Sequence, residues 1–264
     1  MRGRIRRLAC LSLATASGLL EPGGSRIVGS CLVARRGNLL RLERQSEPGN
    51  VQSEWDLEKQ CAPDYAGTIA GMARTALEGR IGPQKILLLG LGGGTMAADL
   101  LINPVDWRIN ITAVESDADV AAAAREVFFP SMFASSPGAA DSKLSVAIGD
   151  ALELVEQPAE LLVDGEGFDV IIEDFAYEQP SLLKPQFWRA LHKLAVPDGT
   201  LLVNTLFDER EQMASLAKDL EIGGWKDVEQ TVDRGLQLEP GEAPTTDPKD
   251  WQPRDNMILE ARAS

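Results

Sequence analysis

Histidine and cysteine are scarce in this chain of 264 residues, and their scarcity excludes several kinds of site. The only histidine is His192, so a histidine-rich metal site is excluded and a Ser-His-Asp hydrolase is disfavoured. The cysteines, Cys10, Cys31 and Cys61, are odd in number and scattered. They show neither a disulfide framework nor the spacing of metal ligands. We therefore predict no metal site.

Long apolar runs and an excess of positive charge are also lacking. No apolar run approaches the roughly 20 residues that a membrane-spanning helix needs, so we expect no membrane span. The formal net charge is −14. An acidic protein repels the phosphates of nucleic acid, which is therefore not an expected partner. The same charge is compatible with a cationic substrate or a basic partner.

The basic residues gather near the N-terminus. Residues 1–45 hold nine Arg and two Glu, a net charge of +7, which leaves −21 for the remainder. The first 20 residues hold four Arg and no acid, a composition typical of an organellar presequence. Ala14-Thr15-Ala16 could instead end a secretory signal, although the apolar stretch before it is short. We expect residues 1–20 to be a targeting segment to a mitochondrion or plastid; otherwise the protein is expected in the cytoplasm.

Residues 21–62 are predicted to form a small β element ahead of a main domain at 63–264. The segment from Arg26 to Arg44 alternates loosely around Gly37, which predicts two short strands joined by a turn. A helix should follow, with Asp64 as its N-cap, apolar residues at helical spacing and Gly79 at its end.

From residue 85 onward, apolar strands alternate with helices. Five segments rich in Ile, Leu and Val have the composition of parallel strands covered on both faces: 85–89, 109–114, 144–148, 168–173 and 200–204. Helices are expected at about 95–102, 117–128, 151–156, 185–195 and 208–221. This alternation predicts an α/β fold with a doubly wound, mostly parallel Rossmann-like sheet.

The C-terminal part holds two more candidate strands, 227–232 and 256–261. Residues 234–255 between them are rich in Pro, Gly and charge. Because that segment is too long for a tight hairpin turn, we interpret it as a flexible insert.

A glycine-rich segment gives the strongest chemical signal. In KILLLGLGGGTMAADLL, residues 85–101, a strand is followed by Gly90, Gly92, Gly93 and Gly94, and then by a helix. Glycines there let the backbone turn sharply and approach a ligand closely. A dinucleotide fingerprint would place another Gly where Thr95 stands. The pattern therefore fits a site for S-adenosylmethionine (SAM) better.

Acidic residues follow the next strands in order. Glu115 ends the second strand, 21 residues after Gly94, where an acid can accept both ribose hydroxyls of a nucleoside. Asp150 follows the third strand and can bond the adenine amino group, or simply cap a helix that begins at Ala151. Asp174 follows the fourth strand, at the sheet edge where open α/β sheets bind ligands. The ordered set predicts a SAM-type cofactor site.

Residues from about 51 to 207 resemble the spermidine synthase-like branch of the polyamine aminopropyltransferase superfamily, which shares the class I SAM-dependent methyltransferase fold. The resemblance rests on VQSEWDL and Tyr65 before the core, and then on LGLGGGT, AVESDAD, IGDA, EDFAYEQPSLLKPQFW and LAVPDGTLLVN in order. It implies a catalytic role for Asp174. It also implies substrate contacts by Gln52, Tyr65, Tyr177 and Glu178, and a homodimer formed through the N-terminal β element.

Two departures from that family affect the expected reaction. The family carries an Asp in the glycine loop that holds the amine of decarboxylated SAM, and here that position is Gly93. The family's D-x-x-D pair begins here at Asp174, but Tyr177 takes the second place and Glu178 comes one residue late. Without the loop Asp, decarboxylated SAM loses a charge-assisted bond. Gly93 is also expected to leave room for the carboxylate of ordinary SAM.

Three functions follow from these observations. We expect a SAM-dependent methyltransferase for an amine or other cationic acceptor, either a small molecule or a protein. Glu173, Asp174 and Glu178 would form an acidic mouth for that acceptor, with Asp174 accepting a proton. The alternatives are a polyamine aminopropyltransferase (spermidine synthase) that uses decarboxylated SAM, and a non-catalytic structural or assembly subunit with the SAM fold.

Overall fold

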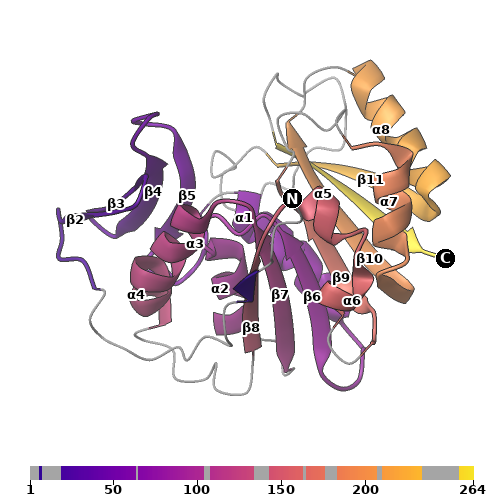
Figure 1. Ribbon diagram of the computed structural model, residues 1–264, viewed down its shortest axis with the longest axis horizontal. Coiled ribbons are helices and arrows are strands. Elements are labelled where there is room, and N and C mark those ends of the chain that lie inside the picture. The colour runs from indigo at the N-terminus through magenta and orange to yellow at the C-terminus, as the bar shows by residue number, and fades with distance from the viewer. Residues whose placement is uncertain are drawn as a thin grey trace.

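Five apolar segments form the parallel part of the main sheet, as their composition predicts. They are β6 (Gln84–Leu89), β7 (Ile109–Glu115), β8 (Lys143–Ile148), β9 (Phe168–Glu173) and β10 (Ala195–Leu206). In this computed structural model they lie in the order β8-β7-β6-β9-β10, and each neighbouring pair is parallel (Figure 1). The strand order reverses between β6 and β9. Ligands of open α/β sheets bind at the carboxyl ends of the strands beside such a reversal.

Antiparallel strands complete both edges of this sheet. The two predicted tail strands are β11 (Trp225–Asp233) and β12 (Asn256–Ala263), and β12 lies between β10 and β11. At the other edge, the two-residue β1 (Arg6–Arg7) pairs with β8. Within the part of the chain that the structure describes, this sheet therefore has eight strands, most of them parallel.

Helices cover both faces of the sheet, each over its own apolar core. One core includes α1 (Tyr65–Leu77), α2 (Thr95–Ile102) and α3 (Ala118–Ala123). The other includes α5 (Ala151–Leu154), α6 (Pro158–Leu161), α7 (Pro185–His192) and α8 (Arg210–Gly223). The predicted doubly wound α/β fold is confirmed. The seventh helix is shorter than expected, because the chain enters β10 at Ala195.

The helix expected at 117–128 is longer and less regular than predicted. It continues from α3 through a π-helical turn, η2 (Ala124–Phe128), into α4 (Phe129–Phe133). A π-turn inserts one extra residue into the helix. Phe128 and Phe129, adjacent in sequence, both lie against the glycine loop: Cβ atoms added to Gly93 and Gly94 would meet their respective rings at 2.9 and 2.4 Å.

The small N-terminal sheet has more strands than predicted. The segment 26–44 was expected to hold two strands, but it holds β2 (Ser25–Val28), β3 (Cys31–Arg36) and β4 (Leu39–Arg44). The expected turn at Gly37 joins β3 to β4, and a second turn at Gly29-Ser30 joins β2 to β3. Gly29 has a φ of 57°, a conformation that suits glycine in a two-residue hairpin turn.

A fourth strand, β5 (Val51–Asp56), pairs with β4 and completes the small sheet. One face of this sheet packs into the core that also contains α1, α2 and α3. Its contribution includes the fully buried side chains Cys31, Val33, Leu40, Leu42 and Trp55. The small sheet is therefore joined to the main domain by apolar packing as well as by sequence.

The structure describes residues 6–7, 19–63, 65–103, 108–133, 143–162, 165–175, 183–206, 210–233 and 256–264. The predicted N-cap Asp64, the insert 234–255 and most of the expected targeting segment 1–20 lie outside these residues. Among the helices that the structure describes, none is both long and apolar enough to cross a membrane.

Candidate active site

A cavity of about 660 Å³ opens at the carboxyl ends of the parallel strands, beside the reversal of strand order. It brings together eight of the residues predicted from sequence: Gln52, Tyr65, Gly90, Gly92, Glu115, Asp150, Ala151 and Asp174. The predicted cofactor and acceptor residues thus share one space. Gly93 and Gly94 do not line it, and Tyr177 and Glu178 lie outside the described residues.

The glycine loop links β6 to α2 and requires glycine for its backbone path. Gly90, Gly92 and Gly94 have φ values of 95°, 54° and 77°, in the left-handed region that residues with a Cβ atom disfavour. A Cβ at Gly90 would also lie 2.7 Å from the backbone oxygen of Asp174. The end of β6 therefore lies directly against the segment that follows β9.

Glu115 holds this loop in place while it faces the cavity. Its Oε2 accepts hydrogen bonds from the backbone N–H groups of Leu91 at 3.2 Å and Gly92 at 3.1 Å. Its Oε1 accepts from the N–H of Asp117 at 2.9 Å. Because each carboxylate oxygen has lone pairs in more than one direction, Glu115 can hold the loop and still accept the hydroxyls of a ribose.

The orientation of Gly93 contradicts one interpretation of the sequence. The N–H of Gly93 donates to Ser53 Oγ at 2.8 Å, and a Cβ at this position would lie 2.9 Å from both Phe128 and Ser53. The space beside Gly93 is therefore filled by protein, and the expectation that it would receive the carboxylate of SAM is wrong. Ser53, which the sequence reading missed, belongs to β5 and also lines the cavity.

Asp150 and Ala151 form the part of the cavity beyond β8. The Oδ1 of Asp150 accepts a hydrogen bond from the N–H of Leu152 at 2.8 Å, which caps α5. The remaining oxygen, Oδ2, can still accept a bond from an adenine amino group. The helix-cap reading is thus observed, and the adenine contact stays a prediction.

Asp174 occupies the part of the cavity beyond β9 and is held by two neighbours. The hydroxyl of Tyr65, at the start of α1, donates to Oδ2 at 3.3 Å. The side-chain amide of Asn204, in β10, donates to Oδ1 at 2.7 Å. Asn204 is fully buried and was not predicted as a site residue. Its sequence signal is a polar residue at the end of the apolar run TLLVN, in the strand beside β9.

Glu173 is not part of an acidic mouth, contrary to the sequence interpretation. Its side chain is fully buried, and its Oε1 accepts a hydrogen bond from the N–H of Phe175 at 3.0 Å. Successive residues of a strand point to opposite faces, so adjacent acids at a strand end need not share a surface. Asp174 lines the cavity and Glu173 does not.

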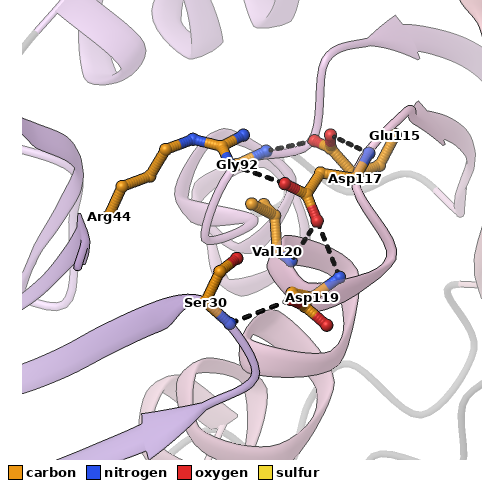
Figure 2. Close-up of polar contacts among 7 residues, drawn as sticks. All are labelled: Ser30, Arg44, Gly92, Glu115, Asp117, Asp119 and Val120. Atoms are coloured by element: carbon orange, nitrogen blue, oxygen red, sulfur yellow. Dashed lines mark hydrogen bonds and ion pairs between the residues drawn. The ribbon is translucent and has the colours of Figure 1, made fainter. Parts of the chain in front are cut away.

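Arg44 extends from β4 to the cavity wall, another contact that the sequence did not reveal. Its Nη1 lies 2.6 Å from Oδ2 of Asp117, the N-cap residue of α3 (Figure 2). Burial raises the pKa of Asp117, but hydrogen bonds from Arg44 and from the N–H groups of Asp119 and Val120 outweigh burial and leave it below the usual value. The hydrogen bond to Asp117 raises the pKa of Arg44, so both partners are charged at neutral pH.

Comparison with known proteins finds one matching family and several similar structures. The family described as "Spermine/spermidine synthase domain" matches residues 63–219, more than half of the chain. A probable spermidine synthase of Corynebacterium glutamicum has a similar structure, with a TM-score of 0.62 and 18% identity over 92% of this chain and 81% of that one. No curated protein sequence matches the chain.

Two further solved structures are similar. Spermidine synthase of Thermotoga maritima has a TM-score of 0.55 and 16% identity over 91% of this chain and 72% of that one. Human Methyltransferase-like protein 13, in complex with SAH, has a TM-score of 0.52 and 20% identity over 77% of this chain and 83% of that one. At such identities the structural likeness shows the shared Rossmann-like fold.

Proposed function

The chain belongs to the spermine/spermidine synthase domain family and is a SAM-dependent transferase, and from that premise we propose that it transfers the methyl group of SAM to an amine. The supporting observation is that the residues predicted to bind the cofactor and the acceptor line one cavity. Gly92, Glu115 and Asp150 offer a place for the nucleoside. Asp174 and Tyr65 offer a place for the acceptor.

The proposed transfer needs little from the protein beyond positioning. The amine nitrogen forms a bond to the methyl carbon while the carbon–sulfur bond breaks, and its electron pair stays on sulfur to give S-adenosylhomocysteine (SAH). An acceptor bound as an ammonium must first lose one proton, because only the neutral nitrogen has the lone pair that attacks, and the methylated nitrogen is left as an ammonium. Asp174, with one oxygen held by Asn204 and the other by Tyr65, is placed to attract the cationic acceptor and to accept that proton.

The glycine loop supports methyl transfer over aminopropyl transfer. Residues 90–95 contain no acid, so the loop offers no anion to the ammonium group of decarboxylated SAM. Aminopropyl transfer is the second candidate, because the family includes it and because an acceptor amine suits Asp174 equally well.

Calorimetric titration with SAM, decarboxylated SAM and SAH tests the proposal. We expect SAM to bind at least as tightly as its decarboxylated form. A preference of tenfold or more for decarboxylated SAM, about 1.4 kcal/mol, would instead favour aminopropyl transfer. Absence of binding by all three ligands at millimolar concentration would contradict both functions.

Replacing Asp174 should separate catalysis from cofactor binding. We expect Asp174→Asn to lower the transfer rate by about 10²–10³-fold, because the substitution removes the charge and the proton acceptor. The affinity for SAH should change by less than about threefold, since Asp174 lies at the acceptor end. Rates are measured by SAH production with a panel of amines. The control is Glu153→Gln, which changes an exposed acid on α5 and should leave the rate unchanged. An unchanged rate for Asp174→Asn would contradict the role assigned to Asp174.

A further inference from the structure

Among the described residues, four polar contacts join the small sheet to the main domain, and two of them lie at the cavity. Away from the cavity, Arg26 pairs with Glu126 in η2 at 3.1 Å, and the N–H of Ser30 donates to Asp119 at 2.9 Å. At the cavity, Arg44 pairs with Asp117, and Ser53 accepts from the N–H of Gly93. Figure 2 shows the Ser30 and Arg44 contacts side by side on the first turn of α3.

The Arg44 contact continues into the glycine loop through an unbroken series of hydrogen bonds. Asp117 accepts from Arg44 through its side chain and donates from its backbone N–H to Oε1 of Glu115. Glu115 then accepts the N–H groups of Leu91 and Gly92 through Oε2. A side chain of the small sheet is thus linked to the two groups that would hold a nucleoside, namely Glu115 and the loop.

Ser53 holds the same loop from the other side. Its Oγ accepts from Gly93 N–H at 2.8 Å and donates to the backbone oxygen of Gln52 at 2.7 Å. β5, which carries Ser53, pairs with β4, which carries Arg44. The loop between β6 and α2 is therefore fixed by Glu115 from the main domain and by Ser53 from the small sheet.

We propose that Arg44 is a positioning residue of the cofactor site, through which the seating of the small sheet on α3 sets the affinity for the nucleoside. The inference rests on the proposed function, because it requires a SAM-type cofactor in this cavity. Arg44 acts through Asp117 and Glu115, which holds the glycine loop. Cofactor binding and docking of the small sheet on α3 then stabilise each other, so the bound cofactor in turn stabilises the docked small sheet.

The Arg26–Glu126 pair provides a matched control within the same sheet. Both pairs join the small sheet to the helix that begins with α3, and both are arginine–carboxylate pairs. The Arg26 pair is longer and more exposed, and neither of its residues lines the cavity. If both pairs only docked the small sheet, their removal would change the affinity for the cofactor to a similar extent. Under the proposed role, removal of the Arg44 pair weakens the affinity much more.

The experiment measures SAH affinity by calorimetry for wild type, Arg44→Gln, Arg26→Gln, Asp117→Asn and the double variant Arg44→Gln/Asp117→Asn. We expect Arg44→Gln to weaken SAH about tenfold and Arg26→Gln to change it by less than about twofold. The double variant should bind no more weakly than Arg44→Gln alone, because both changes remove the same contact. Asn is an effective N-cap, so α3 should remain formed in Asp117→Asn.

Hydrogen exchange supplies a second measurement. If Arg44 had a purely structural role, its replacement would not change the protection that SAH gives to the small sheet. SAH should slow amide exchange in β4 and β5 of wild type, and this protection should be lost in Arg44→Gln while it persists in Arg26→Gln. Equal SAH affinities for the two arginine variants, or no protection of the small sheet, would overturn the inference while the proposed function stands. Failure of wild type to bind SAH would overturn both.

Discussion

Replacing Glu115 by alanine is expected to weaken SAH binding by at least about 100-fold, or about 2.8 kcal/mol. The substitution removes the predicted acceptor of the ribose hydroxyls. It also leaves the N–H groups of Leu91, Gly92 and Asp117 without their partner, so the loop loses its fixed conformation. Calorimetry and the ligand-induced rise in melting temperature measure the effect.

Two further variants serve as controls for the Glu115→Ala result. Glu115→Gln keeps the size of the side chain but replaces one acceptor oxygen by a donor, so its affinity should lie between those of wild type and Glu115→Ala. Glu153→Ala removes an exposed acid from α5 and should bind SAH like wild type. If Glu115→Ala retains SAH affinity within about threefold of wild type, then the cofactor does not occupy the cavity as proposed.

Gly94→Ala should cause a large loss of stability through the glycine loop. Gly94 has a φ of 77°, and an alanine Cβ there would lie 2.4 Å from a carbon of the Phe129 ring. The left-handed conformation costs about 1–2 kcal/mol for a residue with a Cβ atom, and overpacking costs about 1–3 kcal/mol more. We expect the free energy of unfolding, measured by urea denaturation, to fall by about 2–5 kcal/mol.

Gly37→Ala separates the two contributions. Gly37 also has a positive φ, 62°, but a Cβ there would meet nothing within 4 Å. This variant should therefore lose only the conformational part, about 1–2 kcal/mol. Equal losses for Gly94→Ala and Gly37→Ala would show that Phe129 yields without cost, and that the aromatic packing under the loop is not tight.

The parts of the fold that depend on local pattern could be predicted from the sequence. The apolar strands, the helix after the glycine loop and the acids at successive strand ends are each encoded within a few neighbouring residues. The turn at Gly29-Ser30 was missed because the alternation around it is weak. Its glycine is recognisable only once the hairpin partners are known.

The contacts that complete the site could not be predicted, because they join distant parts of the chain. Arg44 meets Asp117, Ser53 meets Gly93 and Asn204 meets Asp174 across separations of 73, 40 and 30 residues. The space beside Gly93 is filled by Ser53 and by Phe128, the last residue of the π-turn, and no sequence period reveals such a turn. Aligning Gly93 with the family's Asp therefore identified the position, but it did not show in which direction a side chain at that position would point.

The packing of the small sheet has a consequence for how the protein folds. Its strands pair with their neighbours in sequence through short turns, so the hairpins can form early and from local contacts. Their apolar face, which includes the buried Trp55 and Leu42, nevertheless stays in water until α1, α2 and α3 have been made. During synthesis the small sheet is made first, but it can dock only after residues more than 60 positions downstream of Trp55 have been made. The cofactor cavity is completed only when this docking has taken place.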